Sequence, residues 1–157
     1  MTARNSFEYK DHVHSDWVDY NGHMNDAAYA IAFSHAVDHF MNDIGLHEKA
    51  RETFAYTIFT LENHICYLKE AHEKEDIYLS IQLIDHDTKR LHVFFKMKNK
   101  NDDLLATSEQ MLMGMDTGEG RPAPFPELVS IEIGKLREAH EHLDQPKQVG
   151  RQIGIRR

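Results

Sequence analysis

The sequence of 157 residues has a single cysteine, four prolines and no long hydrophobic run. Cys66 therefore has no partner for an intramolecular disulfide, and its apolar neighbours at 64–68 predict a buried, unreactive thiol. No stretch is long and apolar enough to cross a membrane, and the first ten residues lack the apolar centre of a signal peptide. We therefore expect a cytoplasmic protein with no membrane partner.

Positive charge is also scarce, since 18 Lys and Arg stand against 26 Asp and Glu and leave a formal net charge of −8. Nonspecific binding to duplex nucleic acid requires many cations that face phosphates, so this balance argues against a nucleic-acid partner. An anionic small molecule is compatible with it, because a local group of Lys and Arg is enough to bind one. The length favours one domain over residues 1–157.

Histidine, in contrast, is abundant, with 12 residues, and this raises the question of a metal site. His35 and His39 have the i, i+4 spacing of a helical zinc-ligand pair, but the residues between them lack the glutamate of the hydrolytic zinc motif. His140 and His142 form a weaker pair. Solvated or hydrogen-bonded histidines are the favoured interpretation, and a histidine-dependent metal protein is the minority alternative.

The hydrophobic pattern predicts one long helix over 24–44, because apolar residues recur there at spacings of three and four. Asn25 and Asp26 suit its first turn and Gly45 suits its end. Alternating or β-branched and aromatic stretches predict strands, and a weaker pattern predicts a short helix. The predicted strands are 8–14, 57–69, 77–84, 89–98 and 104–115, the short helix is 131–143, 47–56 is a charged connection, and 121–126, with three prolines, is irregular.

This order of elements is typical of an α+β protein in which an antiparallel sheet of about five strands packs against one long helix. The helix would cover one face of the sheet, and the other face would be solvated or paired with a second copy. Because an exposed edge or face tends to find a partner, we expect a homodimer or a dimer of dimers.

Residues 16–29, with the sequence DWVDYNGHMNDAAY, are the most informative segment. Asp19 precedes an Asn-Gly turn that leads directly into the long helix. A carboxylate in this place can act on an activated carbonyl as a nucleophile or base, while the free N–H groups of the first helical turn face the developing negative oxygen. From residue types alone, a structural role in the turn is favoured, since Asp is common in turns.

This layout and segment resemble the hotdog-fold acyl-coenzyme A (CoA) thioesterases of the 4-hydroxybenzoyl-CoA thioesterase type. Many of these carry an Asp-x-Asp-x-x-Gly-(His)-x-Asn segment before the central helix. In this chain Trp17 takes the place of the first Asp, Asp19 the second, and Gly22, His23 and Asn25 follow in register. The resemblance covers about 8–116, leaves 117–157 as a C-terminal extension, and implies a hotdog fold with the sheet wrapped around the helix.

The resemblance implies that the chain hydrolyses a small acyl-CoA and that Asp19 is its catalytic residue, as nucleophile or as general base. The amide of Asp26 is implied as an oxyanion donor. His23 and Asn25 are candidates for shaping the turn, capping the helix or orienting water. A structural role is favoured for Asn25, whereas structural and catalytic roles are equally favoured for His23. No cofactor or metal is implied, because CoA is part of the substrate.

Segments 59–68, 89–93, 108–112 and 150–155 further resemble betainyl-CoA thioesterases of bacterial carnitine catabolism. A betainyl group is a quaternary ammonium, which aromatic faces and a nearby carboxylate hold best. The aromatic candidates for this contact are therefore Trp17, Tyr20, Tyr29, Phe33 and Tyr67. Phe33 is expected to be a core residue, and Trp17 and Tyr20 have the better claim because they lie in the turn. Glu62 is a candidate as the carboxylate or as a group that orients water, and a plain edge carboxylate is an equal alternative.

Lys89 and Arg90 are candidates for binding the CoA phosphates, Arg by paired hydrogen bonds, or else an ordinary charged strand end that offsets Asp85 and Asp87. Weaker candidates are Arg121, Arg151, Arg156 and Arg157. Glu109 is expected to be a solvated residue on its strand, since an inward position would need a partner.

A noncatalytic acyl-binding or dehydratase-like hotdog protein is the alternative function. In a dehydratase of this fold, His23 together with a carboxylate would matter more than Asp19. Release of a free thiol from CoA thioesters separates this alternative from the thioesterase.

Overall fold

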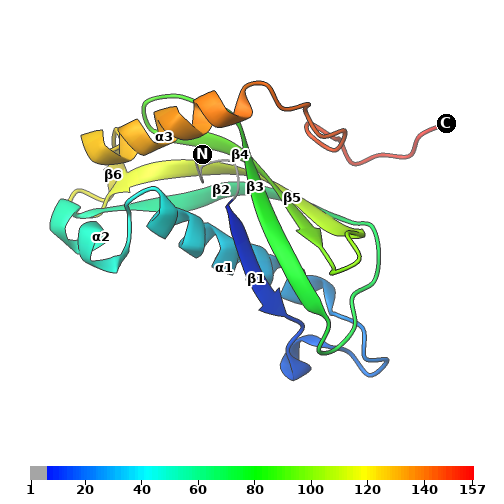
Figure 1. Ribbon diagram of the computed structural model, residues 1–157. Coiled ribbons are helices and arrows are strands. Elements are labelled where there is room, and N and C mark those ends of the chain that lie inside the picture. Colours follow the sequence, from blue (N-terminus) through cyan, green and yellow to red (C-terminus); the bar gives the residue numbers. More distant parts are fainter. Residues whose placement is uncertain (1–6) are drawn as a thin grey trace.

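One antiparallel sheet, with strand order β1-β3-β4-β5-β2 and β6 paired to β5, organises the computed structural model, which describes residues 7–157 (Figure 1). The elements are β1 (Glu8–His12), the 3-10 turn η2 (Ser15–Trp17), α1 (Asp26–Asp43), α2 (Glu48–Phe54), β2 (Tyr56–Tyr67), β3 (Asp76–His86), β4 (Arg90–Lys98), β5 (Leu104–Asp116), β6 (Arg121–Pro122) and α3 (Glu127–His140). The predicted α+β hotdog fold is confirmed. No helix in the described part of the chain is long and apolar enough to span a membrane.

The helix α1 packs against one face of this sheet, which we call the inner face. Its N-cap is Asn25, and Gly45, with a φ of +93° that suits glycine, lies just beyond its last turn. Phe33 is fully buried and lies against Phe95 of β4, with ring centroids 6.1 Å apart. The predicted helix and the core position of Phe33 are confirmed, and the helix boundaries differ by two residues at the start and one at the end.

The outer face of the sheet is covered in part by α3 (Figure 1), whereas we expected this face to be solvated or paired with a second copy. Figure 1 shows α3 on the opposite side of the sheet from α1. The Leu83 N–H, next to a register shift in the β3–β4 pairing, donates to Nδ1 of the buried His140 at 2.9 Å. An imidazole therefore replaces the strand carbonyl that the bulge removes.

Four local predictions differ from the structure. The segment predicted as a charged connection contains α2, whose residues favour a helix although it buries no side chain, so no apolar period marked it. The helix predicted at 131–143 spans Glu127–His140 instead. Pro126 occupies its N-cap, where the missing N–H of proline costs no helical hydrogen bond. The first strand ends at His12, and Arg121–Pro122 forms a two-residue strand.

We expect the free energy of unfolding to decrease as the pH falls below about 6.5, in part because of His140. Burial lowers the pKa of this ring below its usual value of 6.5, so the unfolded chain binds the proton more tightly than the folded chain. This contribution is fully present above pH 6.5 and is lost on acidification. His140→Gln, whose amide oxygen can still accept the Leu83 N–H, should flatten the pH dependence of Tm between pH 7 and 5.

His142→Gln is the matched control, since that ring is 85% exposed. An unchanged pH profile in His140→Gln would contradict the assignment.

Candidate active site

The turn between η2 and α1 is held by a set of short hydrogen bonds around Asp19. Its Oδ1 accepts from the N–H groups of Asn21 at 2.8 Å and His23 at 3.2 Å. The Asp19 N–H donates to the His23 carbonyl, and the Gly22 N–H donates to the Asp19 carbonyl, both at 2.9 Å. Gly22 has a φ of +75°, which a side chain would strain. The structure thus gives Asp19 the turn role that its residue type favoured, through Oδ1 alone.

The second oxygen of this carboxylate, Oδ2, has no hydrogen-bond partner among residues 7–157, and Asp19 is exposed in the single chain. A few residues on, Asn25 caps α1, because its Oδ1 accepts from the Ala27 N–H at 2.9 Å. The Asp26 N–H has no acceptor within the described residues. A free carboxylate oxygen and a free helical amide therefore flank one short turn.

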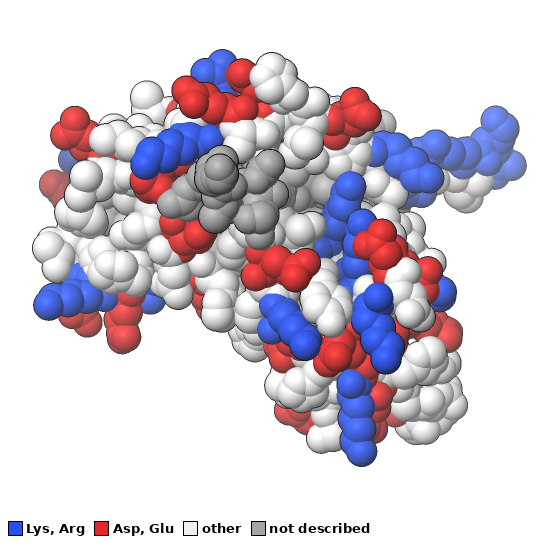
Figure 2. Space-filling model, in the orientation of Figure 1, with Lys and Arg blue, Asp and Glu red and all other residues white. Residues whose placement is uncertain are grey.

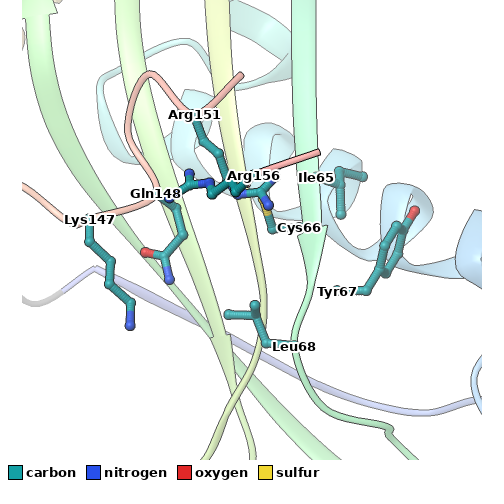
Figure 3. A pocket seen from close by; sticks show the side chains of 8 residues that line it. All are labelled: Ile65, Cys66, Tyr67, Leu68, Lys147, Gln148, Arg151 and Arg156. Atoms are coloured by element: carbon teal, nitrogen blue, oxygen red, sulfur yellow. The ribbon is translucent and has the colours of Figure 1, made fainter. Parts of the chain in front are cut away.

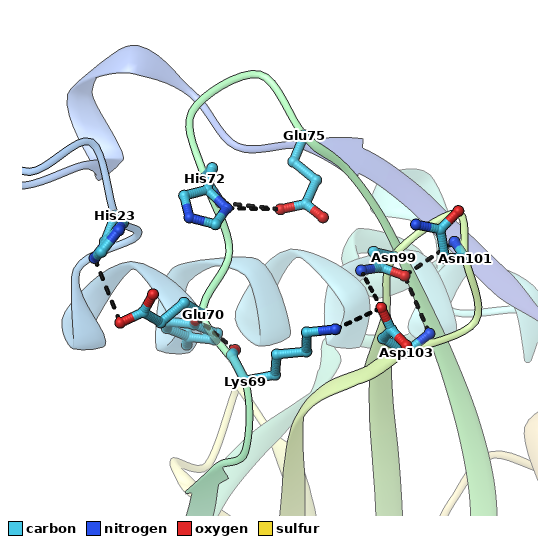
Figure 4. A network of polar contacts seen from close by, with 9 residues as sticks. His23, Lys69, Glu70, His72, Glu75, Asn99, Asn101 and Asp103 are labelled. Atoms are coloured by element: carbon cyan, nitrogen blue, oxygen red, sulfur yellow. Dashed lines mark hydrogen bonds and ion pairs between the residues drawn. The ribbon is translucent and has the colours of Figure 1, made fainter.

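The His23 side chain points towards the loop after β2 (Figure 4). Its Nδ1 lies 3.5 Å from Oε1 of Glu70, and its ring packs edge-on against His72, with centroids 4.9 Å apart. The start of this loop is tied by the Lys69–Asp103 ion pair, with 2.7 Å from Nζ to Oδ2. These contacts join the turn to the end of β2.

Two groups of side chains in the described chain are close enough together to hold a metal ion. They are His23, Glu70 and His72, and Asp11, His12 and His14. The pair that the sequence pointed to is not in either group. Instead, His39 stacks on Tyr9 with ring centroids 4.4 Å apart, and His35 lies 6.3 Å from the Trp17 ring.

The aromatic candidates fall into different environments. Trp17 is only 7% exposed and packs in the core against His14, whereas Tyr20 is 96% exposed. Tyr67 meets Tyr29 of α1 edge-to-face at 5.1 Å, and its hydroxyl donates to the Asp26 carbonyl at 3.3 Å. Burial raises the pKa of both tyrosines, so both phenols stay neutral. The structure brings Tyr29 and Tyr67 together at the helix start. It separates Trp17 from Tyr20, because the first is in the core and the second is in solvent.

Glu62 and the Lys89–Arg90 pair lie away from the turn. Opposite Glu62 is Met111, after a register shift in β2, so Glu62 is on the outer side of the strand while Asn63 is on the inner side. Arg90 binds Asp87, with 2.6 Å from Nε to Oδ2. The Arg90 hydrogen bond is the main reason why the pKa of Asp87 is lowered to about 2. Arg90 is therefore already engaged by one of the acids that it was expected to offset.

Sequence reasoning missed a group of bonded polar side chains on the inner face, in which Ser108 and Gln110 of β5 are buried and Thr60 and Asn63 of β2 are exposed. Ser108 donates to Oδ1 of Asn63 at 2.6 Å and accepts from the Gln110 amide at 2.9 Å, and Thr60 donates to Gln110 at 3.4 Å. Ser108 and Gln110 are at most 2% exposed. The sequence did contain a sign of them. Ser108 and Gln110 alternate with the outward-facing residues of β5 and so point to the core, where polar residues need partners.

Two other expectations are wrong. Cys66 is half-buried and lines a surface cavity, because it lies on the terminal strand of the sheet. Glu109 is not solvated: its Oε2 lies 2.6 Å from Nε2 of His92, and its Oε1 accepts from the Gly150 N–H at 2.8 Å. The C-terminal segment covers it, and sequence periodicity carries no information about such a segment.

Within residues 7–157, no strand pairs with the outer edge of β2. It is the last strand of the sheet, and Phe59, Leu61 and Tyr67 along it are between 51% and 52% exposed. Large apolar side chains on an unpaired edge indicate a surface that binds a partner. This edge runs past the first turn of α1, where Tyr67 contacts Asp26, so a partner there would border the site.

Comparison with known proteins identifies the family. The chain matches the thioesterase-like superfamily over residues 13–133. It is 40% identical to the betainyl-CoA thioesterase of Pseudomonas aeruginosa, over 94% of this chain and 93% of that protein. It is also 34% identical to an L-carnitine dehydrogenase/betainyl-CoA thioesterase of Rhizobium meliloti, over 92% of this chain and 29% of that longer protein.

Solved structures agree. A Staphylococcus aureus protein in complex with CoA superposes with a TM-score of 0.90 at 37% identity, covering 96% of this chain and 95% of that one. A putative thioesterase from Pseudomonas putida gives a TM-score of 0.82, also at 37% identity, with 95% and 96% covered. The fold and these relatives define the class, which is that of the hotdog thioester hydrolases. More particularly, the chain belongs to the thioesterase-like superfamily.

We expect Asn25→Ala to lower the free energy of unfolding by about 1 kcal/mol, because the Ala27 N–H loses its cap. Urea unfolding measures this. Asn25→Ser keeps a capping oxygen and should restore the stability. Asn42→Ala, an exposed site near the other end of α1, is the control. Full stability in Asn25→Ala would rule out the cap as the role of this residue.

Proposed function

We propose that the chain hydrolyses an acyl-CoA thioester at the start of α1, with Asp19 as the catalytic carboxylate and the Asp26 N–H as an oxyanion donor. The observation that carries this proposal is the free Asp26 amide directly after a turn that leaves one Asp19 oxygen unpaired. The 40% identity to a betainyl-CoA thioesterase over nearly the whole chain supports it.

Two routes use the same groups. In the first, Oδ2 of Asp19 attacks the thioester carbonyl, the CoA thiolate leaves, and water hydrolyses the resulting anhydride. In the second, Asp19 takes a proton from a water molecule that attacks the carbonyl directly. In both, the carbonyl oxygen becomes negative, and the Asp26 N–H at the positive end of the helix dipole stabilises it.

The carboxylate is the first point to test. We expect Asp19→Asn to lower kcat for acyl-CoA hydrolysis by about 10²- to 10⁴-fold, because the charge is lost while the amide oxygen can still accept the turn hydrogen bonds. Release of free thiol measures the rate, and circular dichroism verifies the fold. Asp16→Asn, an exposed acid three residues earlier, is the control. Folded, fully active Asp19→Asn would overturn the proposal, and loss on His23→Ala alone would favour the dehydratase-like alternative.

We propose further that the acyl group is betainyl and that the exposed Tyr67, which packs on the buried Tyr29, contacts its trimethylammonium. The pair lies at the first turn of α1, and Asp26 and Glu70 add exposed carboxylates close by. Aromatic faces with nearby negative charge attract a quaternary ammonium, which cannot donate hydrogen bonds. The buried Trp17 is a poorer candidate, since its replacement would disturb the core.

The acyl group can be tested with two substrates of equal shape. Tyr67→Leu should lower kcat/KM for betainyl-CoA about tenfold more than for the neutral 3,3-dimethylbutanoyl-CoA, because only the former loses a cation–π contact. Tyr67→Phe, which keeps the ring, is the control for the lost hydroxyl. Equal losses for both substrates would exclude the cation–π role.

We also propose that the active form is a homodimer, or a dimer of dimers, that pairs through β2. The exposed apolar edge beside α1 supports it. Leu61→Lys should place a charge in this contact, give a monomer in light scattering, and reduce activity at the same enzyme concentration. The exposed Lys49→Leu is the control for a charge change elsewhere. A stable wild-type monomer with full activity would contradict the dimer.

A further inference from the structure

A cavity of about 640 Å³ lies between the C-terminal segment and the end of β2 (Figure 3). Its volume is within the range of small-molecule sites. From the strand come Ile65, Cys66, Tyr67 and Leu68, and from the segment come Lys147, Gln148, Arg151 and Arg156. One wall is therefore mostly apolar, and the other carries three cations.

These cations lack carboxylate partners. None of Lys147, Arg151 and Arg156 forms an ion pair within the part of the chain that the structure describes, whereas Arg90, Arg121 and Lys135 do. Figure 2 shows Lys and Arg gathered along the projecting C-terminal segment, in a chain whose net charge is −8. Unpaired positive charge concentrated at one cavity favours an anionic ligand.

A hydrogen bond from a backbone N–H to a side chain of β5 holds this segment on the outer face of the sheet. The Gly150 N–H donates to Oε1 of Glu109, whose other oxygen is bonded to His92. The Arg151 N–H donates to the Gln148 carbonyl at 3.1 Å, and Gly150 has a φ of +74°. The chain therefore turns at Gly150, and Arg151 follows directly from an anchored position.

The cavity reaches the proposed catalytic turn through β2. Alternation along the strand puts Cys66 and Leu68 on the side of the C-terminal segment and Ile65 and Tyr67 on the side of α1, as Figure 3 shows. Tyr67 lines the cavity and also donates to the Asp26 carbonyl. Tyr67 thus links the wall of this cavity to the first turn of α1.

We infer that Lys147, Arg151 and Arg156 form the binding site for the phosphates of the acyl-CoA, an inference that rests on the proposed function. The pantetheine arm lies along Ile65–Leu68, and the thioester reaches Asp19 and the Asp26 amide. Guanidinium groups suit phosphates because they offer paired N–H donors. This assigns the phosphates to the C-terminal segment in place of Lys89 and Arg90.

The experiment compares two thioesters that carry the same acyl group, one on CoA and one on pantetheine, which lacks the phosphates. Arg151→Gln/Arg156→Gln should raise KM for the CoA thioester by at least about tenfold with kcat little changed, and should leave kcat/KM for the pantetheine thioester unchanged. Lys98→Gln/Lys135→Gln removes two cations that are paired elsewhere with Asp102 and Glu132, and should change neither.

Equal losses for both substrates would show that the arginines act on the structure and not on phosphate, and no loss for either would also overturn the assignment. Calorimetry with CoA itself separates this inference from the proposed function. If wild type binds CoA about tenfold or more tightly than the double variant but hydrolyses no thioester, the phosphate site stands and the catalytic proposal fails. If wild type hydrolyses thioesters, but wild type and the double variant bind CoA equally, the catalytic proposal stands and the phosphate site fails.

Discussion

The turn from Asp19 to His23 is the constraint on which the proposed chemistry depends. Its hydrogen bonds occupy one carboxylate oxygen of Asp19 and leave the other unpaired. Asn25 caps α1 at the Ala27 N–H, so the Asp26 N–H has no acceptor within the described residues. A long helix begins at this point because its apolar stripe is buried against the sheet, so the free amide cannot move away from the turn without unpacking the core. Local backbone bonding and global packing therefore position the same two groups.

The open edge of β2 connects this turn to the rest of the molecule. Tyr67 at the end of the strand contacts the first turn of α1, and the same stretch lines the cavity that the C-terminal segment closes. A strand with an unpaired edge has backbone donors and acceptors and apolar side chains free for a ligand or a second chain. The proposed thioester site, the proposed dimer contact and the C-terminal segment all border this edge.

Charge is divided in a way that suits an anionic substrate on an acidic protein. Arg90 is held by Asp87 and Lys69 by Asp103, so these cations have little left to offer a phosphate. The cations of the C-terminal segment have no such partners among the described residues. Because exposed charges farther apart than about 10 Å are screened at moderate ionic strength, the local group decides binding and the net charge of −8 does not.

From the sequence alone, the α+β class, the long helix, the four long strands and the turn before the helix could be predicted, because they follow from periodicity and from residues with strong local preferences. The family resemblance pointed to Asp19 and Asp26 on the same local evidence. The contacts of Tyr67 and Glu109, the exposure of Cys66 and the position of Arg151 depended on which strands became neighbours and where the C-terminal segment crossed them. Short-range patterns contain no such information, since residues far apart in the chain meet only when the sheet has closed and its last strand is left open.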